Sequence, residues 1–270
     1  MDLRRQTPDY PEAVEALRRA AYSRPMSRPS EAKDGIAPTL ATPECPHCRK
    51  PTPLCVCEGV KPIKSRLDLL ILQHPQEQDR ALGTARLTAL HFDRAVLKIG
   101  LSWPSLSKAL GRPVADPSRW AVLYLGSAKA ADLDTTEEVV AINRKGEMAE
   151  HQRAILREIE GVVLLDGTWS QAKALWWRNA WMLKCQRVVL GPAQPSRYGK
   201  LRREPRRDGL STIEAAALIL SRLEGRPDIA DTLNASFAQM LDRYREALDE
   251  QPSLAPKPRP KRDYRRRKRA

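Results

Sequence analysis

Six short aliphatic runs, five of them followed by a stretch of helical character, constrain the fold of this chain more than any other feature. The runs cover residues 66–74, 94–100, 120–126, 138–144, 161–167 and 186–191. Each is rich in Val, Leu or Ile and ends at a polar residue or glycine, which is typical of buried strands. Helices are expected near residues 81–91, 104–110, 149–159, 170–183, 211–224 and 231–249. The alternation predicts an α/β domain with a largely parallel sheet flanked by helices.

The chain outside this domain differs in composition. Residues 1–43 hold one short amphipathic stretch followed by a segment rich in Pro and Ser, and we expect a flexible leader with a short helix. A cysteine cluster predicts a small module at residues 44–62, the main domain follows at 63–250, and 251–270 is predicted to be a disordered basic tail. With no long apolar run and no secretory signal, the sequence predicts a cytoplasmic protein that does not enter a membrane.

The positive charge of the chain is concentrated in two segments. The formal net charge is +14, of which residues 252–270 contribute +8 and residues 184–207 contribute +7. The first segment is either a solvated tail or an arm that contacts nucleic acid. The second reads as a loop within the folded domain, which makes it the better candidate for an RNA surface, with plain surface solubility as the alternative. Its candidate RNA-binding residues are Arg197, Lys200, Arg202, Arg203, Arg206 and Arg207.

Four cysteines lie within thirteen residues. They are Cys45, Cys48, Cys55 and Cys57. In a chain without secretory features, thiols this close together indicate metal ligands more than disulfides. Four thiolates complete the tetrahedral shell of a structural Zn²⁺ ion, and an iron–sulfur cluster or unligated thiols are the alternatives.

The segment 161–183 contains the sharpest local motif, Asp-Gly-Thr-Trp at 166–169. An aliphatic strand ends at Asp166, and a helix follows that Thr168 or Ser170 could cap. A carboxylate in this position can accept a proton or hold a polar ligand group, although another helix cap is the structural alternative. Further along, Trp177 and Trp181 are four residues apart and are predicted to pack along one face of the helix.

Two further segments carry candidate polar residues. His74 ends the predicted strand at 66–74 and is either a second candidate base or a histidine bonded to the backbone beside Pro75. Ser211 and Glu214 form a predicted capping box before an apolar helix. The N–H groups at that helix start could still bind an anion beside Thr212.

Four segments together resemble the DTW domain family, and within it the enzymes that transfer an aminocarboxypropyl group to uridine in tRNA. They are CPHCRKPTPLCVC at 45–57, LLILQHPQE at 69–77, DGTW at 166–169 and PSRYGKLRREPRRDGLSTIEA at 195–215. The resemblance implies a SPOUT-like knotted fold that binds S-adenosylmethionine. It also implies transfer of the 3-amino-3-carboxypropyl group to N3 of a tRNA uridine, with release of methylthioadenosine.

The resemblance also implies roles for particular residues. Asp166 is expected to act as the base or to orient the cofactor's amino group, and Trp169 to stack on the uracil or shape the pocket. Thr168 and His74 complete the expected catalytic group. The expected cofactor contacts are Leu125, Gly126, Ser127, Asp166, Gly167, Pro192, Ser196, Tyr198, Ser211, Thr212 and Glu214.

Two other functions fit parts of the sequence. A knotted RNA methyltransferase would use the same cofactor and the same basic loop, but it would leave S-adenosylhomocysteine. A zinc-ribbon RNA-binding protein without catalysis would need only the cysteines and the tail, and the Asp-Gly-Thr-Trp turn disfavours it. The sequence is compatible with either a monomer or a homodimer.

Overall fold

The structure is a computed structural model of the 270-residue chain, and it describes residues 43–78, 80–124, 137–191, 195–199, 201 and 209–250. The leader helix predicted before residue 43 and the tail predicted after residue 250 lie outside these ranges. Within the described part of the chain, no helix is both long and apolar enough to cross a membrane.

A six-stranded sheet forms the centre of the domain. Its strands are β1 (Asp68–Gln73), β2 (Ala95–Ile99), β3 (Trp120–Leu123), β4 (Val139–Ile142), β5 (Gly161–Asp166) and β6 (Gln186–Leu190). Their order in the sheet is β2-β1-β5-β3-β6-β4. All neighbouring pairs are parallel except β4, which runs antiparallel to β6 at the edge. The predicted, largely parallel α/β sheet is confirmed, because each aliphatic run forms one strand.

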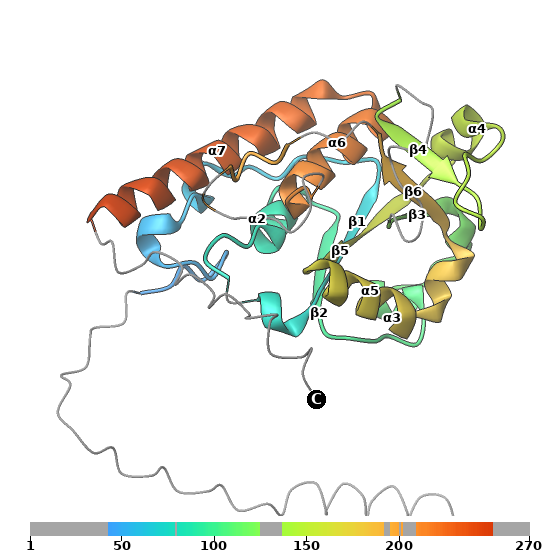
Figure 1. The fold of residues 1–270 in the computed structure, drawn as a ribbon, viewed down its shortest axis with the longest axis horizontal. Coiled ribbons are helices and arrows are strands. Elements are labelled where there is room, and N and C mark those ends of the chain that lie inside the picture. Colours follow the sequence, from blue (N-terminus) through green and yellow to red (C-terminus); the bar gives the residue numbers. More distant parts are fainter. Residues whose placement is uncertain are drawn as a thin grey trace, which may run out of the picture. The chain divides into compact units, whose positions relative to one another are not determined.

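Helices cover both faces of the sheet (Figure 1). The α-helices are α2 (Ala85–Leu90), α3 (Leu106–Leu110), α4 (Gln152–Arg157), α5 (Trp169–Arg178), α6 (Thr212–Glu224) and α7 (Pro227–Glu250). Short 3₁₀ turns are η1 (Thr52–Leu54), η2 (Cys57–Gly59), η3 (Pro75–Glu77), η4 (Pro117–Arg119) and η6 (Ala180–Lys184). Alternate strand residues point to opposite faces, so each face buries its own set of side chains.

The core is divided between these two faces. Leu69 and Ile71 of β1 pack with α2, α6 and α7 in the larger cluster. Their neighbours Leu70 and Leu72 point the other way and pack with α3, η6 and Trp176 of α5. The period-two alternation along β1 therefore decides which helices pack on which side of the sheet.

The cysteine segment is joined to the main domain by apolar packing. Leu54 and Val56 are buried in the same cluster as Phe237 of α7. The Lys50 side chain is also buried, and its Nζ donates a 2.5 Å hydrogen bond to the Ala81 carbonyl. The conformation of the cysteine segment is thus coupled to that of the domain.

The helix predicted over 170–183 is interrupted at Asn179, so the prediction of one continuous helix is wrong there. Asn179 leaves helical geometry, with φ −123° and ψ 70°, and its buried side-chain amide donates to the carbonyls of Leu101 and Leu175. Trp177 and Trp181 consequently do not share one packed face. Trp181 is buried in η6, whereas Trp177 of α5 is 72% exposed.

Candidate functional site

The carboxyl ends of β1 and β5 bring two polar side chains together. The strands pair in parallel with Gln73 opposite Asp166, so both residues lie at the end of the sheet where these strands finish. Gln73 Nε2 donates to Asp166 Oδ2 at 2.8 Å. Gln73 is only 2% exposed, and its Oε1 has no hydrogen-bond partner among the described residues. A glutamine in this position fixes the orientation of the Asp166 carboxylate.

A second donor reaches the same carboxylate from the C-terminal part of the chain. The hydroxyl of Thr212, the first residue of α6, hydrogen-bonds to Asp166 Oδ1. Asp166 is half-buried, and its backbone carbonyl accepts the His74 N–H at 2.9 Å. Three predicted site residues, Asp166, His74 and Thr212, are therefore neighbours at one edge of the sheet.

The Asp-Gly-Thr-Trp turn leads directly into α5. Thr168 caps the helix, since its Oγ1 accepts the Gln171 N–H while the Gln171 side chain accepts the Thr168 N–H at 2.6 Å. Trp169 is the first helical residue and is half-buried. The helix cap occupies the Thr168 hydroxyl, which favours a structural role for this member of the expected catalytic group.

His74 hydrogen-bonds to the backbone just after Pro75, as its predicted structural role requires. Its Nδ1 accepts the Gln76 N–H at 3.3 Å and so caps the turn η3. Gln76 Oε1 in turn accepts from Gln171 Nε2 at 3.3 Å, which ties this turn to α5. His74 also lies against the motif, because a Cβ on Gly167 would be 3.4 Å from the His74 Cβ.

Glu214 connects α6 to the segment at residues 195–199. Its carboxylate is buried and accepts hydrogen bonds from Ser196 Oγ and the Arg197 N–H, each at 2.7 Å. It also accepts the Ser211 N–H at 2.8 Å, and Ser211 Oγ accepts the Glu214 N–H. The predicted capping box is confirmed, and the expected cofactor contacts Ser196, Ser211 and Glu214 lie together in it.

Tyr198 is a core residue in this structure. It is 2% exposed, its hydroxyl donates to the Leu82 carbonyl at 2.6 Å, and its ring meets Phe237 edge to face at a centroid distance of 5.0 Å. These contacts favour packing over the expected cofactor contact. Arg197 beside it is exposed. The remaining predicted residues lie outside the described part of the chain: Leu125, Gly126, Ser127, Pro192, Lys200, Arg202, Arg203, Arg206 and Arg207.

The four cysteine sulfurs form one cluster. Sγ atoms of Cys45, Cys48, Cys55 and Cys57 all lie within 4.8 Å of one another, with Cys48 and Cys55 3.8 Å apart. Four sulfurs at about 2.3 Å from a tetrahedral zinc ion are about 3.8 Å apart, so the cluster fits such an ion. A backbone N–H of Cys48 lowers the pKa of Cys45 to about 6, whereas burial raises the pKa values of Cys48 and Cys57, so the support for a metal site comes from the positions of the four sulfurs.

Arg49 shapes the first half of this cluster. Its φ is 59°, a left-handed conformation that is uncommon for residues other than glycine, and its N–H bonds to the Cys45 carbonyl at 2.9 Å. The tight turn brings Cys45 and Cys48 to the same side. His47 is exposed on the outside of this turn.

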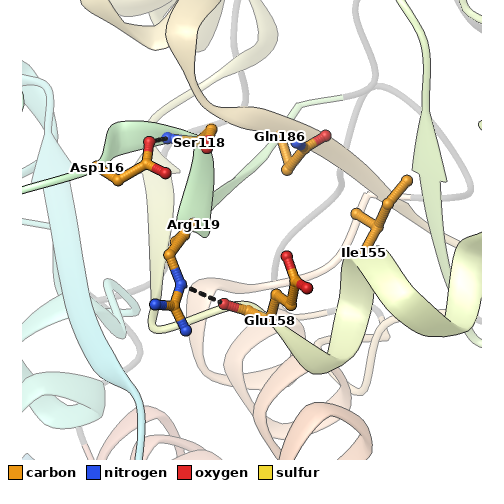
Figure 2. A pocket seen from close by; sticks show the side chains of 6 residues that line it. All are labelled: Asp116, Ser118, Arg119, Ile155, Glu158 and Gln186. Atoms are coloured by element: carbon orange, nitrogen blue, oxygen red, sulfur yellow. Dashed lines mark hydrogen bonds between the residues drawn. The ribbon is translucent and has the colours of Figure 1, made fainter.

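A separate hollow of about 300 Å³, whose lining residues Figure 2 shows, lies near the amino ends of central strands. Its lining residues are Asp116, Ser118, Arg119, Ile155, Glu158 and Gln186. Gln186 begins β6, and Arg119 directly precedes β3. The hollow is therefore at the amino ends of these strands, away from Asp166.

Comparison with known proteins identifies the family. The profile of the DTW domain matches residues 42–245. A mouse protein named tRNA-uridine aminocarboxypropyltransferase 2 is 33% identical over 195 residues, which is 71% of this chain and 60% of that protein. The protein of the same name from Macaca fascicularis is 31% identical and is covered to 62%. The Drosophila melanogaster protein of that name is 30% identical over 70% of both chains.

The matches cover about 70% of this chain and a smaller share of the two mammalian relatives. This chain spans about three-fifths of the length of the two mammalian relatives. No solved structure matches it significantly. The family profile nevertheless covers most of the sequence, including the cysteine cluster, the Asp166 turn and the Ser211 helix start. The chain belongs to the DTW domain family.

Proposed function

We propose that this protein transfers the 3-amino-3-carboxypropyl group of S-adenosylmethionine to N3 of a uridine in tRNA. Family membership and the shared name of three relatives support the reaction class. The structural observation that carries the proposal is the motif carboxylate of Asp166, held by Gln73 and Thr212 where β1 and β5 end. Ligands of open α/β sheets bind outside the carboxyl ends of the strands.

The proposed transfer requires a proton acceptor near the carboxyl ends of β1 and β5. When bound, S-adenosylmethionine supplies a methylene carbon whose bond to sulfur breaks as the bond to uridine N3 forms, and the electron pair leaves on methylthioadenosine. Uridine N3 must lose its proton to attack, so a base within hydrogen-bond reach is needed. Asp166 takes this role in the proposal, or it holds the amino group of the transferred moiety. In either role, two donors fix the position of its carboxylate.

The start of α6 supplies a site for the negative charge of the transferred group. Helix N-termini favour anions because their first N–H groups lack partners within the helix. In α6, the Glu214 N–H is bonded to Ser211 Oγ and the Ile213 N–H to Thr84 Oγ1. Thr212 has the N–H of this first turn that no described residue accepts, so we expect Thr212 to contact both Asp166 and the carboxylate.

The cysteine cluster is proposed as a structural zinc site. Four thiolates leave no position open for water, which is the arrangement of structural rather than catalytic zinc. All five cysteines of the chain lie in its described part and are free thiols, as expected in the reducing cytoplasm, which we propose as the compartment. The module stabilises the domain through Leu54 and Val56.

A SPOUT-like knot is part of the proposal for the fold. Strand β5 lies between β1 and β3, although it follows both in the sequence, and β6 lies on the far side of β3. After β6 the chain returns to the edge where β5 ends, because Thr212 meets Asp166 there. A chain that returns across its own sheet in this way supports the knot that the family resemblance implies.

Nucleoside mass spectrometry tests the proposed reaction. Unmodified tRNA is incubated with the protein and S-adenosylmethionine and then digested. We expect a uridine carrying one aminocarboxypropyl group, together with methylthioadenosine in equal amount. A methylated nucleoside with S-adenosylhomocysteine would instead establish a methyltransferase, and an unchanged tRNA with tight RNA binding would contradict both enzyme functions.

Variants of the carboxylate connect the reaction to this edge. Asp166→Ala should abolish transfer, because both the proton acceptor and the ligand of Thr212 are removed. Asp116→Ala, in the hollow near the amino ends of central strands, is the matched control and should retain activity. Transfer by Asp166→Ala at the rate of the wild type would remove Asp166 from the mechanism.

A further inference from the structure

We infer that Trp177 is a stacking platform for an unpaired base of the bound RNA. The C-terminal part of α5 would then contact the substrate at a second place, away from Asp166. The inference rests on the proposed function, since it takes tRNA as the ligand. Trp177 is 72% exposed, and Leu183 on the adjoining η6 is 64% exposed. Large apolar side chains that are exposed commonly mark a binding surface when they gather in one region.

The exposure of Trp177 follows from how the rest of α5 is held. Leu175 is fully buried, and Trp176 stacks on Tyr124 at the end of β3 with ring centroids 4.5 Å apart. At 100° per residue, these two contacts turn the next side chain away from the sheet. Asn179 then ends the helix with hydrogen bonds to Leu101, Leu175 and Trp103. The indole of Trp177 is therefore presented on a rigid support.

The charge around Trp177 favours a polyanion as the occupant. Lys173 lies one helical turn before Trp177 on the same face, and Arg178 and Lys184 follow it. All three are exposed, and none forms an ion pair with another described residue. Residues 167–203 contain eight Lys or Arg and no Asp or Glu. An exposed indole among unpaired cations is the combination that binds single-stranded nucleic acid.

The position of Trp177 suits a ligand that also reaches the motif. Trp169 and Trp177 are the first and ninth residues of α5, which separates them by about 12 Å along the helix axis. That length corresponds to roughly four stacked nucleotides at about 3.4 Å each. One loop of a tRNA can thus place its target uridine at Asp166 and another unpaired base on Trp177.

Binding to single-stranded and duplex RNA tests this surface. Trp177→Ala should weaken the affinity for an unmodified tRNA transcript and for a short single-stranded oligoribonucleotide by about 5- to 150-fold, the range of one lost stacking contact. Affinity for a blunt duplex of the same length should be unchanged, because its bases are paired. Trp177→Phe should retain most of the affinity. Equal losses on both RNAs, or no loss on either, would overturn the inference.

Salt dependence separates stacking from charge. The slope of log K against log salt should be the same for Trp177→Ala and the wild type, since stacking releases no counterions. Lys173→Ala should instead make the slope shallower by about 0.7 to 1. A changed slope for Trp177→Ala would contradict a stacking role.

A second exposed apolar side chain and the oligomeric state provide two controls. Met148 is 44% exposed but lies between Glu147 and Glu150, so Met148→Ala should leave RNA affinity unchanged.

Light scattering should show the same mass for Trp177→Ala and the wild type. A wild-type dimer that Trp177→Ala dissociates, with RNA affinity intact, would establish a protein interface in place of the RNA surface.

The stacking role and the proposed reaction can fail independently. Transfer activity with RNA affinity insensitive to Trp177 would refute the stacking role alone. Binding that depends on Trp177 in a protein without transfer activity would leave the stacking role in place and refute the reaction.

Discussion

Asp166 accepts hydrogen bonds from residues far apart in the chain. Gln73 precedes it by 93 positions and Thr212 follows it by 46. The carboxylate therefore has its present orientation only when β1, β5 and α6 are all assembled. This makes the orientation of one side chain a property of the folded domain.

Removing one of these donors should reduce catalysis more than stability. Thr212→Val keeps the side-chain volume and loses the hydroxyl that bonds to Asp166. A hydrogen bond to a charged group contributes about 1.5–3 kcal/mol, so we expect kcat/KM for transfer to fall about 10- to 100-fold. Thr212→Ser retains the hydroxyl and should keep most of the activity. Wild-type kcat/KM in Thr212→Val would show that this bond does not assist the reaction.

His91 should make the stability of the domain depend on pH. It is 1% exposed, neither ring nitrogen has a hydrogen-bond partner among the described residues, and burial lowers the pKa of its side chain. The unfolded chain binds a proton near pH 6.5, whereas the folded chain binds it only at lower pH. The free energy of unfolding should therefore fall as pH drops below about 6.5.

Replacing His91 tests this dependence. His91→Leu removes the titrating group, so urea unfolding at pH 7.5 and pH 5.0 should show a smaller difference between the two pH values than in the wild type. The loss cannot exceed about 1.4 kcal/mol for each pH unit below 6.5. If the free energy of unfolding of His91→Leu depended on pH as strongly as that of the wild type, residues other than His91 would cause the dependence.

At the scale of elements, the start of α6 has two functions that can be separated. Its capping box stabilises the helix, and the same Glu214 carboxylate holds residues 195–199 through Ser196 and the Arg197 N–H. Residues 195–199, which include the expected cofactor contacts Ser196 and Tyr198, are thus hydrogen-bonded to α6, the helix that begins with Thr212. Any ligand at this position is held by one connected group of elements.

Substitutions in the capping box should differ in their effect on stability. Ser211→Ala removes the cap and should lower the free energy of unfolding by about 1 kcal/mol. Glu214→Ala leaves the buried Ser211 N–H and the part-buried donors of Ser196 and Arg197 without their acceptor, so we expect a loss of about 2–4 kcal/mol. Chemical denaturation measures both. Wild-type stability in Glu214→Ala, with loss of S-adenosylmethionine binding, would instead assign Glu214 to the ligand.

The elements were more predictable from the sequence than the contacts between them. Aliphatic runs bounded by polar residues located every strand, because burial on both faces of a parallel sheet needs continuous apolar stretches. The antiparallel direction of β4 has no such signal. Asn179 breaks the predicted helix through bonds to Leu101, a residue 78 positions away. Tertiary contacts of this kind overrule local helix propensity.

The candidate site shows the same limit. Asp166, His74 and Thr212 were predicted because each lies at the end of a strand or at the start of a helix. Gln73 was missed, since it reads as the end of an aliphatic strand, and only its register opposite Asp166 reveals its role. A polar residue as the last position of a buried run was the available signal. Tyr198 resembled a loop residue, and its burial depends on Leu82 and Phe237 from distant segments.

For the molecule as a whole, the cysteine module should contribute to global stability. Its apolar residues Leu54 and Val56 share a core with α7, so loosening the module exposes part of that core. A site of four thiolates links the stability of the domain to metal binding. The module is therefore expected to act as part of one folding unit with the domain.

Removing one thiolate tests this link. Cys57→Ser should lose bound metal, measured by elemental mass spectrometry, and lower Tm by about 5–10 °C. Cys185→Ser is the matched control, because Cys185 is outside the cluster and burial raises the pKa of its thiol to about 12. Stoichiometric metal in Cys57→Ser would show that Cys57 is not a ligand.

The close approach at Gly167 limits how this family motif can vary in the chain. A Cβ at Gly167 would lie 2.8 Å from the Gln171 Cβ, which is too close for ordinary contact, and every residue except glycine has that atom at position 171. A larger residue at position 167 must therefore move the start of α5, and with it the neighbours Thr168 and Trp169. Natural sequences that carry a side chain at the second position of the motif should show compensating changes at positions 171 and 74, and the three positions should vary together across the family.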